Sequence, residues 1–405
     1  MNDLKKTAVR ALCVILAVLL VPAAAVLFSE TGQRALSAVK DAAAASAELA
    51  MGGDEFAARR LQSAQDILDL YTQAADALTV VNTPSAEFDE RLPLYSGSPW
   101  AIDMAPDETE TPSLEVPVAT PSEEILSAIP YPADLEDHDG VIKDVHYARY
   151  TGSSFIDLAA GGQVRNCTDL SNADLLAESE KLPAFTIEAN SKEPQVLIYH
   201  THTTESFEPY TRDFYDKDFT CKSTDVTMNI TAVGDEICKQ LDAAGIAYVH
   251  DTTVHDYPSY NGSYQSSRET VQAILKKYPS IKVVLDVHRD AIEQSDGTRL
   301  APIQVIDGKR AAQLMIISCC DDGTMNMPNY LKNFRFASLL QSTTETTYPG
   351  LTRPVLFDYR FYNQDLTTGS LLVEVGSHGN SIDEVKYTGE LFGKALAKAL
   401  EGISS

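Results

Sequence analysis

The chain has 405 residues, with 58 acidic against 32 basic side chains, and a formal net charge of −26 at pH 7. So acidic a balance excludes a protein that binds nucleic acid through its phosphates, because few cations are available to neutralise them. The six cysteines include no CxxC pair, which excludes a disulfide scaffold and a cysteine zinc site. A chain of this length is sufficient for one substantial domain with smaller parts attached.

Residues 1–30 have the features of a membrane anchor. Three basic residues among the first ten precede an apolar run from 11 to 28, about the minimum length of a spanning helix. Positive charge on this short side predicts that it lies in the cytoplasm, with the rest of a single-pass cell-membrane protein outside the cytoplasm. The small residues at 23–25 are also compatible with a cleaved signal peptide, and the length of the run favours an uncleaved anchor.

Two segments without catalytic features follow the anchor. Residues 31–82 are rich in alanine, leucine, glutamate and glutamine and hold no proline, which predicts a helical stalk with a break at Gly52-Gly53. Its apolar stripe fits either a partner-facing surface or a plain stalk. Residues 83–133 hold nine prolines and ten acids against one base, Arg91, so we expect an acidic, extended and disordered linker.

The remaining chain predicts an α/β domain. Residues 134–190 contain short β-like pieces and are expected to form an accessory region, and residues 191–405 the catalytic domain. In the latter, strands are expected at 196–199, 246–249, 282–287, 303–306, 314–318 and 371–375, and helices at 226–244, 266–277, 329–347 and 381–400. Such alternation predicts one domain with a largely parallel sheet flanked by helices. The last helix starts with a capping box, Ser381 to Glu384.

Two histidines and a glutamate follow the first of these strands, Val196–Tyr199. The β-branched and aromatic residues of this stretch predict a buried strand. His202 and Glu205 follow its carboxyl end, where open α/β sheets collect ligands. An imidazole and a carboxylate at this spacing can bind one ion, and a catalytic zinc takes three protein ligands and keeps one position for water.

Two later strand-like stretches carry similar groups. The stretch from 281 to 287 ends at His288, and the stretch from 370 to 375 contains a single carboxylate, Glu374. A buried charge is costly unless it is paired or binds a metal, so Glu374 requires a partner or a function. Together these strand ends predict a shared site.

Three motifs resemble one known family. The stretches HTHTTESF, VVLDVHRDA and LLVEVGSHGNSIDEV, in this order within residues 190–402, resemble the stage II sporulation protein P family of endospore-forming Firmicutes. The resemblance implies a zinc-dependent N-acetylmuramoyl-L-alanine amidase that degrades septal peptidoglycan during engulfment, from the mother-cell septal membrane. It is compatible with a second, endopeptidase activity. It also implies two partners, the sporulation D protein, a lytic transglycosylase, and the sporulation M membrane protein.

With this resemblance, the strand-end residues are expected to hold zinc. We expect His202, Glu205 and His288 to be the ligands, with His200 as an alternative histidine and Glu208 as an alternative carboxylate. Because side chains alternate along an extended chain, His200 and His202 can share one side, and only geometry can choose between them. Zinc would lower the pKa of a bound water and polarise the amide carbonyl.

Further roles are expected around these ligands. Glu374 would take the proton of the water and pass it to the leaving amine, the alternative being a structural carboxylate paired with Arg289 or another base. Arg289 itself would bind a stem-peptide carboxylate or the developing oxyanion, or else pair with Asp290. Asp286 would support a ligand by hydrogen bonding or form a buried turn. His378 would contact substrate or, as the default, be exposed in a loop.

The other candidates have weaker patterns. Glycan rings could stack on three loop tyrosines, Tyr257, Tyr260 and Tyr264, which otherwise only pack. Four histidines outside any pattern are expected at the surface: His138, His146, His250 and His255. Cys319 and Cys320 lie in an apolar run and are expected in the core. The rival functions are a metallopeptidase that cleaves only stem-peptide cross-links and a non-catalytic scaffold that binds the cell wall.

Overall fold

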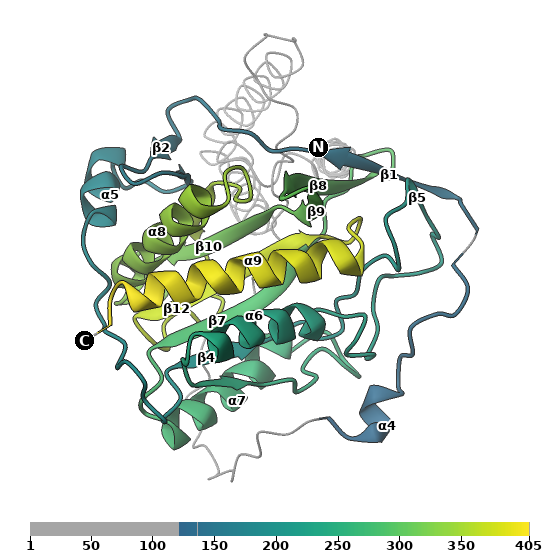
Figure 1. The fold of residues 1–405 in the computed structure, drawn as a ribbon, viewed down its shortest axis with the longest axis horizontal. Helices are drawn as coiled ribbons and strands as arrows, with labels where there is room; N and C mark the ends of the chain where they lie inside the picture. Colours follow the sequence, from purple (N-terminus) through teal and green to yellow (C-terminus); the bar gives the residue numbers. More distant parts are fainter. Residues whose placement is uncertain (1–120, 136, 405) are drawn as a thin grey trace, which may run out of the picture. The chain divides into compact units, whose positions relative to one another are not determined.

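The computed structural model describes residues 121–135 and 137–404 (Figure 1). The predicted anchor, the predicted stalk and residues 83–120 of the predicted linker lie outside these residues. Within the described ranges, no helix is both long enough and apolar enough to cross a membrane.

The main sheet has eight strands in the order β2-β3-β11-β10-β12-β7-β4-β6. Their bounds are Phe155–Asp157 (β2), Gln163–Asn166 (β3), Val196–Tyr199 (β4), Tyr248–His250 (β6), Val283–Asp290 (β7), Leu314–Cys320 (β10), Val355–Tyr359 (β11) and Gly369–Ser377 (β12). Five of the seven neighbouring pairs are parallel, and the β10–β12 and β2–β3 pairs are antiparallel. The sheet is therefore mixed, with the largely parallel pairing that the sequence predicts.

The parallel group β6, β4, β7 and β12 positions the site. Leu197 pairs with Val284 and Tyr199 with Asp286 across β4 and β7, and Glu374 pairs with His288 across β7 and β12. Neighbours in register project to the same face of a sheet. The polar groups at the ends of these strands thus share one face and one edge.

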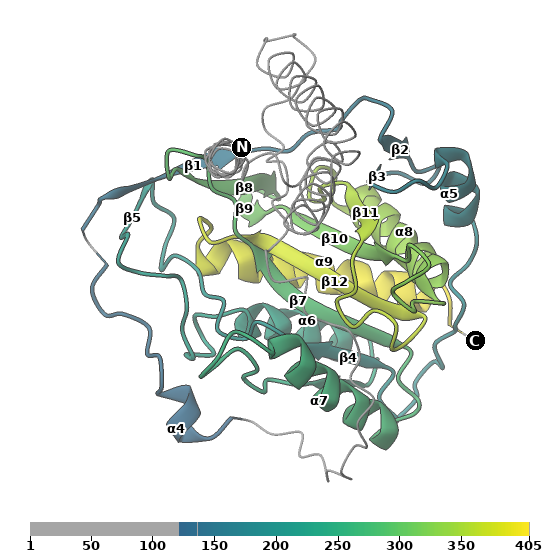
Figure 2. The same cartoon turned by 180° about the vertical axis from the view of Figure 1, so that it is seen from behind.

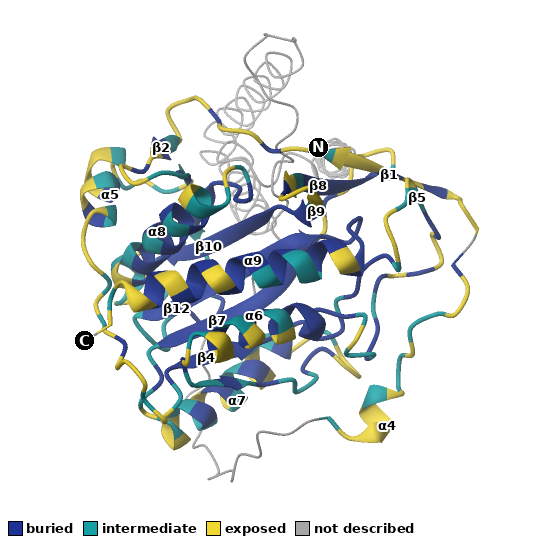
Figure 3. Cartoon of the chain, in the orientation of Figure 1, coloured by how far each residue is buried: buried dark blue, intermediate teal, exposed yellow. Residues whose placement is uncertain are grey.

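Helices cover both faces of the sheet. Three helices, α6 (Thr231–Ala243), α8 (Tyr330–Thr347) and α9 (Ile382–Glu401), lie across the face that is nearer in Figure 1, and α7 (Ser263–Lys277) lies on the other face, as Figure 2 shows. The largest hydrophobic core lies under the three helices, while Val271 and Ile274 of α7 pack on Leu197 and Val284. The strands between the layers are buried almost throughout (Figure 3).

The predicted capping box starts α9. The Ser381 hydroxyl accepts from the Glu384 backbone N–H, and the Glu384 carboxylate accepts from the backbone N–H of Ser381. Two glycines let α9 approach α6 closely, since a Cβ at Gly389 would lie 2.9 Å from the Val233 carbonyl oxygen, and one at Gly393 2.9 Å from Gln240. A larger residue at either position would force the two helices apart.

A second sheet has four strands in the order β5-β1-β8-β9. Its strands are Gly140–Val145 (β1), Phe214–Tyr215 (β5), Arg299–Ile306 (β8) and Lys309–Ala312 (β9). The region expected to be accessory thus supplies β1 to this sheet and β2 and β3 to the edge of the main sheet, and it also contains α5 (Asn172–Ser179).

The end of the predicted linker is held against the domain. A short helix, α4, spans Glu123–Leu126. After it, the Ile129 backbone N–H donates to the Thr224 hydroxyl at 2.9 Å, and the Tyr131 hydroxyl donates to the Phe207 carbonyl at 2.6 Å. The apolar Ile129 and Tyr131 give this stretch contacts that the acidic, proline-rich composition of the whole segment does not suggest.

Candidate active site

The residues predicted to bind metal meet at one edge of the main sheet. His202 and Glu205 lie in the turn that follows β4, and His288 lies near the end of β7. One ligand atom from each of the three residues lies within 4.8 Å of the others. Nδ1 of His202 is 3.5 Å from one carboxylate oxygen of Glu205, and Nδ1 of His288 is 3.5 Å from the other.

This arrangement fits a zinc ion. Two atoms bound to one tetrahedral zinc at 2.0–2.1 Å are about 3.3 Å apart, close to the two observed separations. At 3.5 Å the two imidazoles and the carboxylate are too far apart for good hydrogen bonds to one another. In the described part of the chain, Nε2 of His202 is also buried without a hydrogen-bond partner. The donor set, two imidazoles and a carboxylate, is one that catalytic zinc uses.

Asp286 contacts His288, in the position that the sequence predicts for a residue that supports a metal ligand. Its Oδ1 lies 2.8 Å from Nε2 of His288, the nitrogen that faces away from Glu205. The same carboxylate accepts from the backbone N–H and the hydroxyl of Thr201. Burial disfavours the charge on His288, but Asp286 and Glu205 outweigh burial and raise the pKa of His288 well above its usual range.

The electrostatics of Glu205 match this environment. Burial by itself would raise its pKa, but the neighbouring His202 and His288 side chains hold the pKa well below its usual range. The backbone N–H of Arg289 also donates to Glu205 Oε2 at 3.0 Å. Glu205 is therefore an anion facing two imidazoles, as a metal ligand should be.

Glu374 lies beside the candidate metal ligands, opposite His288 in the β7–β12 register. Its side chain is buried, and its Oε2 has no hydrogen-bond partner among the described residues. Burial, followed by the negative charge of Asp290, raises the pKa of Glu374 to about 8. A carboxylate with this pKa is well suited to accept and return a proton near neutral pH.

The guanidinium of Arg289 binds backbone carbonyl groups and does not face the site. Its guanidinium donates to the carbonyl oxygens of Ser206 at 2.8 Å, Cys221 at 2.9 Å and Asp290 at 3.2 Å. The Asp290 carboxylate pairs with Arg353 instead, at 2.9 Å. The expected Arg289–Asp290 side-chain pair is therefore absent from the described residues, and the contact of Arg289 with the site is its backbone N–H.

His200, the alternative histidine, does not join the metal-binding group. Its Nδ1 lies 2.9 Å from the Val287 carbonyl oxygen, so this nitrogen carries a proton and donates. Its Nε2 faces Nε2 of His250 at 2.9 Å, and His250 in turn faces Asp235 at 3.2 Å. Both nitrogens of His200 are occupied by the protein.

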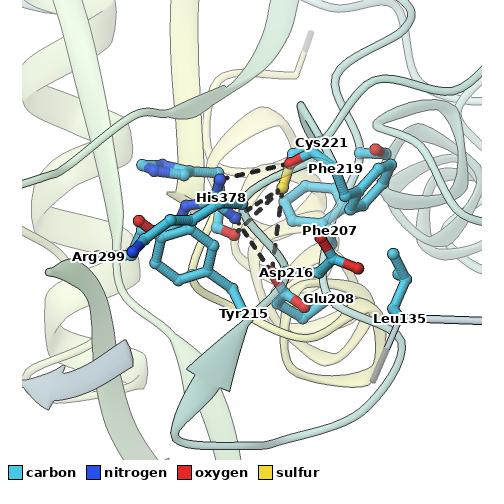
Figure 4. A network of polar contacts seen from close by, with 12 residues as sticks. Leu135, Phe207, Glu208, Tyr215, Asp216, Phe219, Cys221, Arg299 and His378 are labelled. Carbon is cyan, nitrogen blue, oxygen red and sulfur yellow. Dashed lines mark hydrogen bonds and ion pairs between the residues drawn. The ribbon is translucent and has the colours of Figure 1, made fainter. Parts of the chain in front are cut away.

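Glu208, the alternative carboxylate, is also occupied. It is buried, forms an ion pair with Arg212 and another with Arg299 at 3.3 Å, and lies beside the buried thiol of Cys221 (Figure 4). The Arg299 guanidinium also lies 3.6 Å from the centre of the Tyr215 ring. With two arginines on it, Glu208 has no capacity left for a metal.

Several weaker predictions can be compared with the structure. His378 is buried and its Nε2 lies 3.5 Å from Glu293, so the default of an exposed loop histidine is wrong. His255 is also buried, against expectation, with Nδ1 2.9 Å from the Ser266 hydroxyl and Nε2 3.5 Å from Asp251. His250 is half-buried, and His138 and His146 are exposed as predicted.

Cys319 and Cys320 are buried free thiols, as predicted.

Of the three tyrosines, Tyr260 and Tyr264 lie against His202. The ring centroids are 4.4 Å apart for Tyr260 and 5.4 Å for Tyr264. Tyr257 is 37% exposed.

Sequence reasoning missed Arg353. This side chain is buried, binds Asp290, and acts on Glu374 by lowering its pKa against the larger effect of burial. A base directly before a proline and an apolar strand is a weak signal, because its partner lies 63 residues away.

Comparison with known proteins identifies one family. A profile of the stage II sporulation protein P family matches residues 158–397. Stage II sporulation protein P of Bacillus subtilis (strain 168) is 31% identical over 230 residues, which cover 52% of this chain and 54% of that protein. The chain thus spans about half the length of the curated relative it matches.

Solved structures that resemble the chain include two amidases. One is the N-acetylmuramoyl-L-alanine amidase AmiC2 of Nostoc punctiforme, at 13% identity over 52% of this chain and 97% of that chain, with a TM-score of 0.31. The other is the CwlD amidase of Clostridioides difficile in complex with the GerS lipoprotein, at 10% identity over 51% and 99%, with a TM-score of 0.32. Scores at this level support no argument about fold or function. Because the family profile covers more than half of the chain and includes the metal-binding residues and Glu374, the chain belongs to the stage II sporulation protein P family.

Proposed function

We propose that this protein is a zinc-dependent N-acetylmuramoyl-L-alanine amidase that cleaves the amide between N-acetylmuramic acid and L-alanine in peptidoglycan. The observation that carries the proposal is the group His202, Glu205 and His288 beside the buried carboxylate of Glu374, whose Oε2 has no partner in the described part of the chain. Membership in the stage II sporulation protein P family supports a role in sporulation.

His202, Glu205 and His288 would hold the zinc, which when bound supplies a water of lowered pKa and polarises the amide carbonyl. Asp286 fixes the His288 ring by its contact with Nε2, so that Nδ1 points toward Glu205. The backbone N–H of Arg289 fixes one oxygen of Glu205. These contacts preorganise the site before substrate arrives.

Glu374 moves the proton. Its unpartnered Oε2 accepts a proton from the attacking water and then delivers it to the nitrogen of the leaving L-alanine. Asp290 raises the proton affinity of Glu374, and Arg353 balances part of this effect through its ion pair with Asp290. The buried surroundings keep the carboxylate from bulk water, which favours proton transfer within the site.

The cellular setting is part of the proposal. We propose that the apolar amino-terminal segment anchors the chain as a single-pass protein of the mother-cell septal membrane, with the α/β domain outside the cytoplasm. Degradation of septal wall during engulfment would then involve the sporulation D and sporulation M proteins as partners. Cleavage of stem-peptide cross-links would be a second activity of the same centre.

Product analysis on purified peptidoglycan tests the proposal. The protein is incubated with intact sacculi and with zinc, and the soluble products are identified by mass spectrometry. An amidase releases stem peptides with a free L-alanine amino terminus and leaves lactoyl groups on the glycan. Split cross-links alone would indicate the metallopeptidase, and no products with peptidoglycan still bound would indicate a scaffold.

A further inference from the structure

Arg353 uses only one of its three side-chain nitrogens for hydrogen bonds within the described part of the chain. Its Nη1 donates to Oδ2 of Asp290 at 2.9 Å. Its Nε and Nη2 are buried and have no hydrogen-bond partner among the described residues. The residue is 4% exposed, and its guanidinium lies over the Tyr147 ring, 5.7 Å from the ring centre. A buried cation thus keeps two donor groups that the described protein does not use.

The two nitrogens form one edge of the guanidinium. A guanidinium is planar and always charged, so Nε–H and one N–H of Nη2 point in the same direction. Two parallel donors at this spacing match the two oxygens of a carboxylate. Donors that are buried without a partner are costly. The edge therefore favours a ligand that supplies a pair of acceptor oxygens.

The guanidinium of Arg353 lies at the strand ends that build the candidate site. Arg353 precedes β11, and its backbone N–H donates to the Leu314 carbonyl of β10 at 2.7 Å. The next strand in the sheet is β12, which carries Glu374. Asp290, which accepts from the guanidinium, ends β7 two residues after His288. The charge of Arg353 acts on Glu374 by lowering its pKa against the larger effect of burial.

The proposed substrate carries the group that this edge would bind. The stem peptide lies on the amine side of the scissile amide and bears carboxylates. Because the net charge of the protein is −26, an acidic peptide is not attracted from a distance, and its recognition requires a cation within the site. The guanidinium of Arg289 does not supply one, since it donates to backbone carbonyls.

We propose that Arg353 is a specificity-determining residue whose Nε–Nη2 edge binds a carboxylate of the stem peptide. The inference rests on the proposed amidase function and adds the substrate class, namely stems whose carboxylates are free and not amidated. Asp290 keeps Nη1 and holds the guanidinium in place while the stem binds. Arg353 takes no part in the proton transfer, which passes through Glu374.

The first test compares two synthetic muramoyl peptides that differ only in having carboxylates or carboxamides on the stem. The wild type should cleave the carboxylate form with a KM about 10–100-fold lower and a similar kcat, because the carboxamide loses hydrogen bonds between charged groups. Arg353→Lys keeps the positive charge beside Asp290 but lacks the parallel donors, so the preference should fall below about threefold. An undiminished preference in Arg353→Lys, or equal KM values in the wild type, would overturn the proposal.

Arg212→Lys is the matched control. All three side-chain nitrogens of Arg212 are bound, Nε and Nη2 by Glu208 and Nη1 by the Leu135 carbonyl. The same substitution there removes a bidentate pair with a structural role, and it should leave the preference for the carboxylate peptide at the wild-type value. Equal loss of the preference in both variants would point to a general effect of losing a buried guanidinium and would contradict the assignment of Arg353.

The second test needs no turnover. Binding of the free stem peptide, in its carboxylate and carboxamide forms, to the zinc-loaded protein is measured by isothermal titration calorimetry. The wild type should bind the carboxylate form about 10–100-fold more tightly, and Arg353→Lys should bind the two forms alike. Should Arg353→Lys not fold, equal Kd values in the wild type would still overturn the proposal. If both expected results are found but no muramoyl amide is cleaved, the amidase function is wrong while the assignment of Arg353 stands.

Discussion

Glu205 and Glu208 stand three residues apart on the same loop and lie in opposite electrostatic environments. Glu205 faces two imidazoles at 3.5 Å each. Glu208 forms ion pairs with Arg212 and Arg299 and is buried beside Cys221 (Figure 4). Both are acids in a protein interior, but only the partners of Glu208 carry a permanent positive charge.

This difference distinguishes a carboxylate with a structural role, Glu208, from one with a proposed functional role, Glu205. A buried carboxylate that is fully compensated by guanidinium groups ties chain segments together, here the 206–223 loop to β8. A largely buried carboxylate that faces two imidazoles at 3.5 Å, with Nε2 of His202 lacking a partner among the described residues, has no guanidinium partner and can accept a bound cation. The predictions below test this contrast.

The largest effects are expected from alanine at each of the two glutamates. Glu208→Ala leaves Arg212 and Arg299 buried without their anion, so the free energy of unfolding should fall by about 3–5 kcal/mol. Glu205→Ala should abolish zinc retention and stem-peptide release. In the metal-free state it should cost only about 1 kcal/mol, because Glu205 is held by one backbone hydrogen bond and two 3.5 Å contacts and by no guanidinium group. Urea unfolding of chelator-treated proteins and zinc analysis measure both quantities.

The contrast would fail if the two variants behaved alike. Should Glu208→Ala prevent folding, Glu208→Gln provides the same comparison with a smaller perturbation. Zinc loss in a folded Glu208→Gln variant would show that the ion pairs are part of the metal site.

Glu374→Gln tests the proton transfer. The amide is nearly the same size but cannot accept the proton of water, so kcat should fall about 10²–10⁴-fold. Zinc content should equal that of the wild type, because Glu374 is not expected to be a ligand. Rates of stem-peptide release and zinc content are measured on the same preparation, and a rate within tenfold of wild type would remove Glu374 from the role of base.

Asp286→Asn tests the support of His288. Loss of this carboxylate from the ring nitrogen should weaken zinc binding about 10–100-fold. The affinity is measured by competition with a chelator of known strength. Unchanged affinity would mean that the contacts of Asp286 with Thr201 alone account for its burial.

The smallest expected effect comes from replacing His378, and it concerns how the free energy of unfolding depends on pH. Burial, together with the charges of Arg289 and Arg299 and against that of Glu293, lowers its pKa from 6.5 to about 4. As the pH falls below 6.5, the unfolded chain takes up this proton and the folded chain does not, so stability decreases between pH 6.5 and 4. Between pH 7.5 and 5.5 the loss should be about 1.3 kcal/mol, and His378→Asn should lack it in urea unfolding. An unchanged pH slope in the variant would contradict this assignment.

The sequence predicts the strands that build the site and misses several others, among them β9 and β11. The strands β4, β7 and β12 are apolar runs, because both faces of the central strands are covered. In contrast β9, Lys309–Ala312, begins with two charged residues and is partly exposed. The strand β11 follows directly on Pro354, and its pairing with β10 and β3 is nonlocal. β9 has no local strand pattern, whereas β11 begins with three apolar residues, 355–357, that sequence reasoning overlooked.

The sequence predicts the site residues that directly follow strands. It does not predict side-chain positions that depend on a backbone turn or on a partner far away in the sequence. Alternation along an extended chain places His200 and His202 on one side, but the chain turns after Tyr199, which sends His200 to the Val287 carbonyl. Burial of His378 and the Arg353–Asp290 pair arise from contacts between distant segments. The spacing of residues along the sequence does not predict such contacts.

Zinc titration of the metal-stripped protein, followed by stem-peptide release from peptidoglycan, tests the central claim most directly. The account predicts that activity is absent without metal, rises linearly with added zinc and reaches its plateau at a single ion per chain. His202→Ala and His288→Ala should show no such rise. Full activity in the stripped wild type, or a wild-type titration curve in either variant, would contradict it.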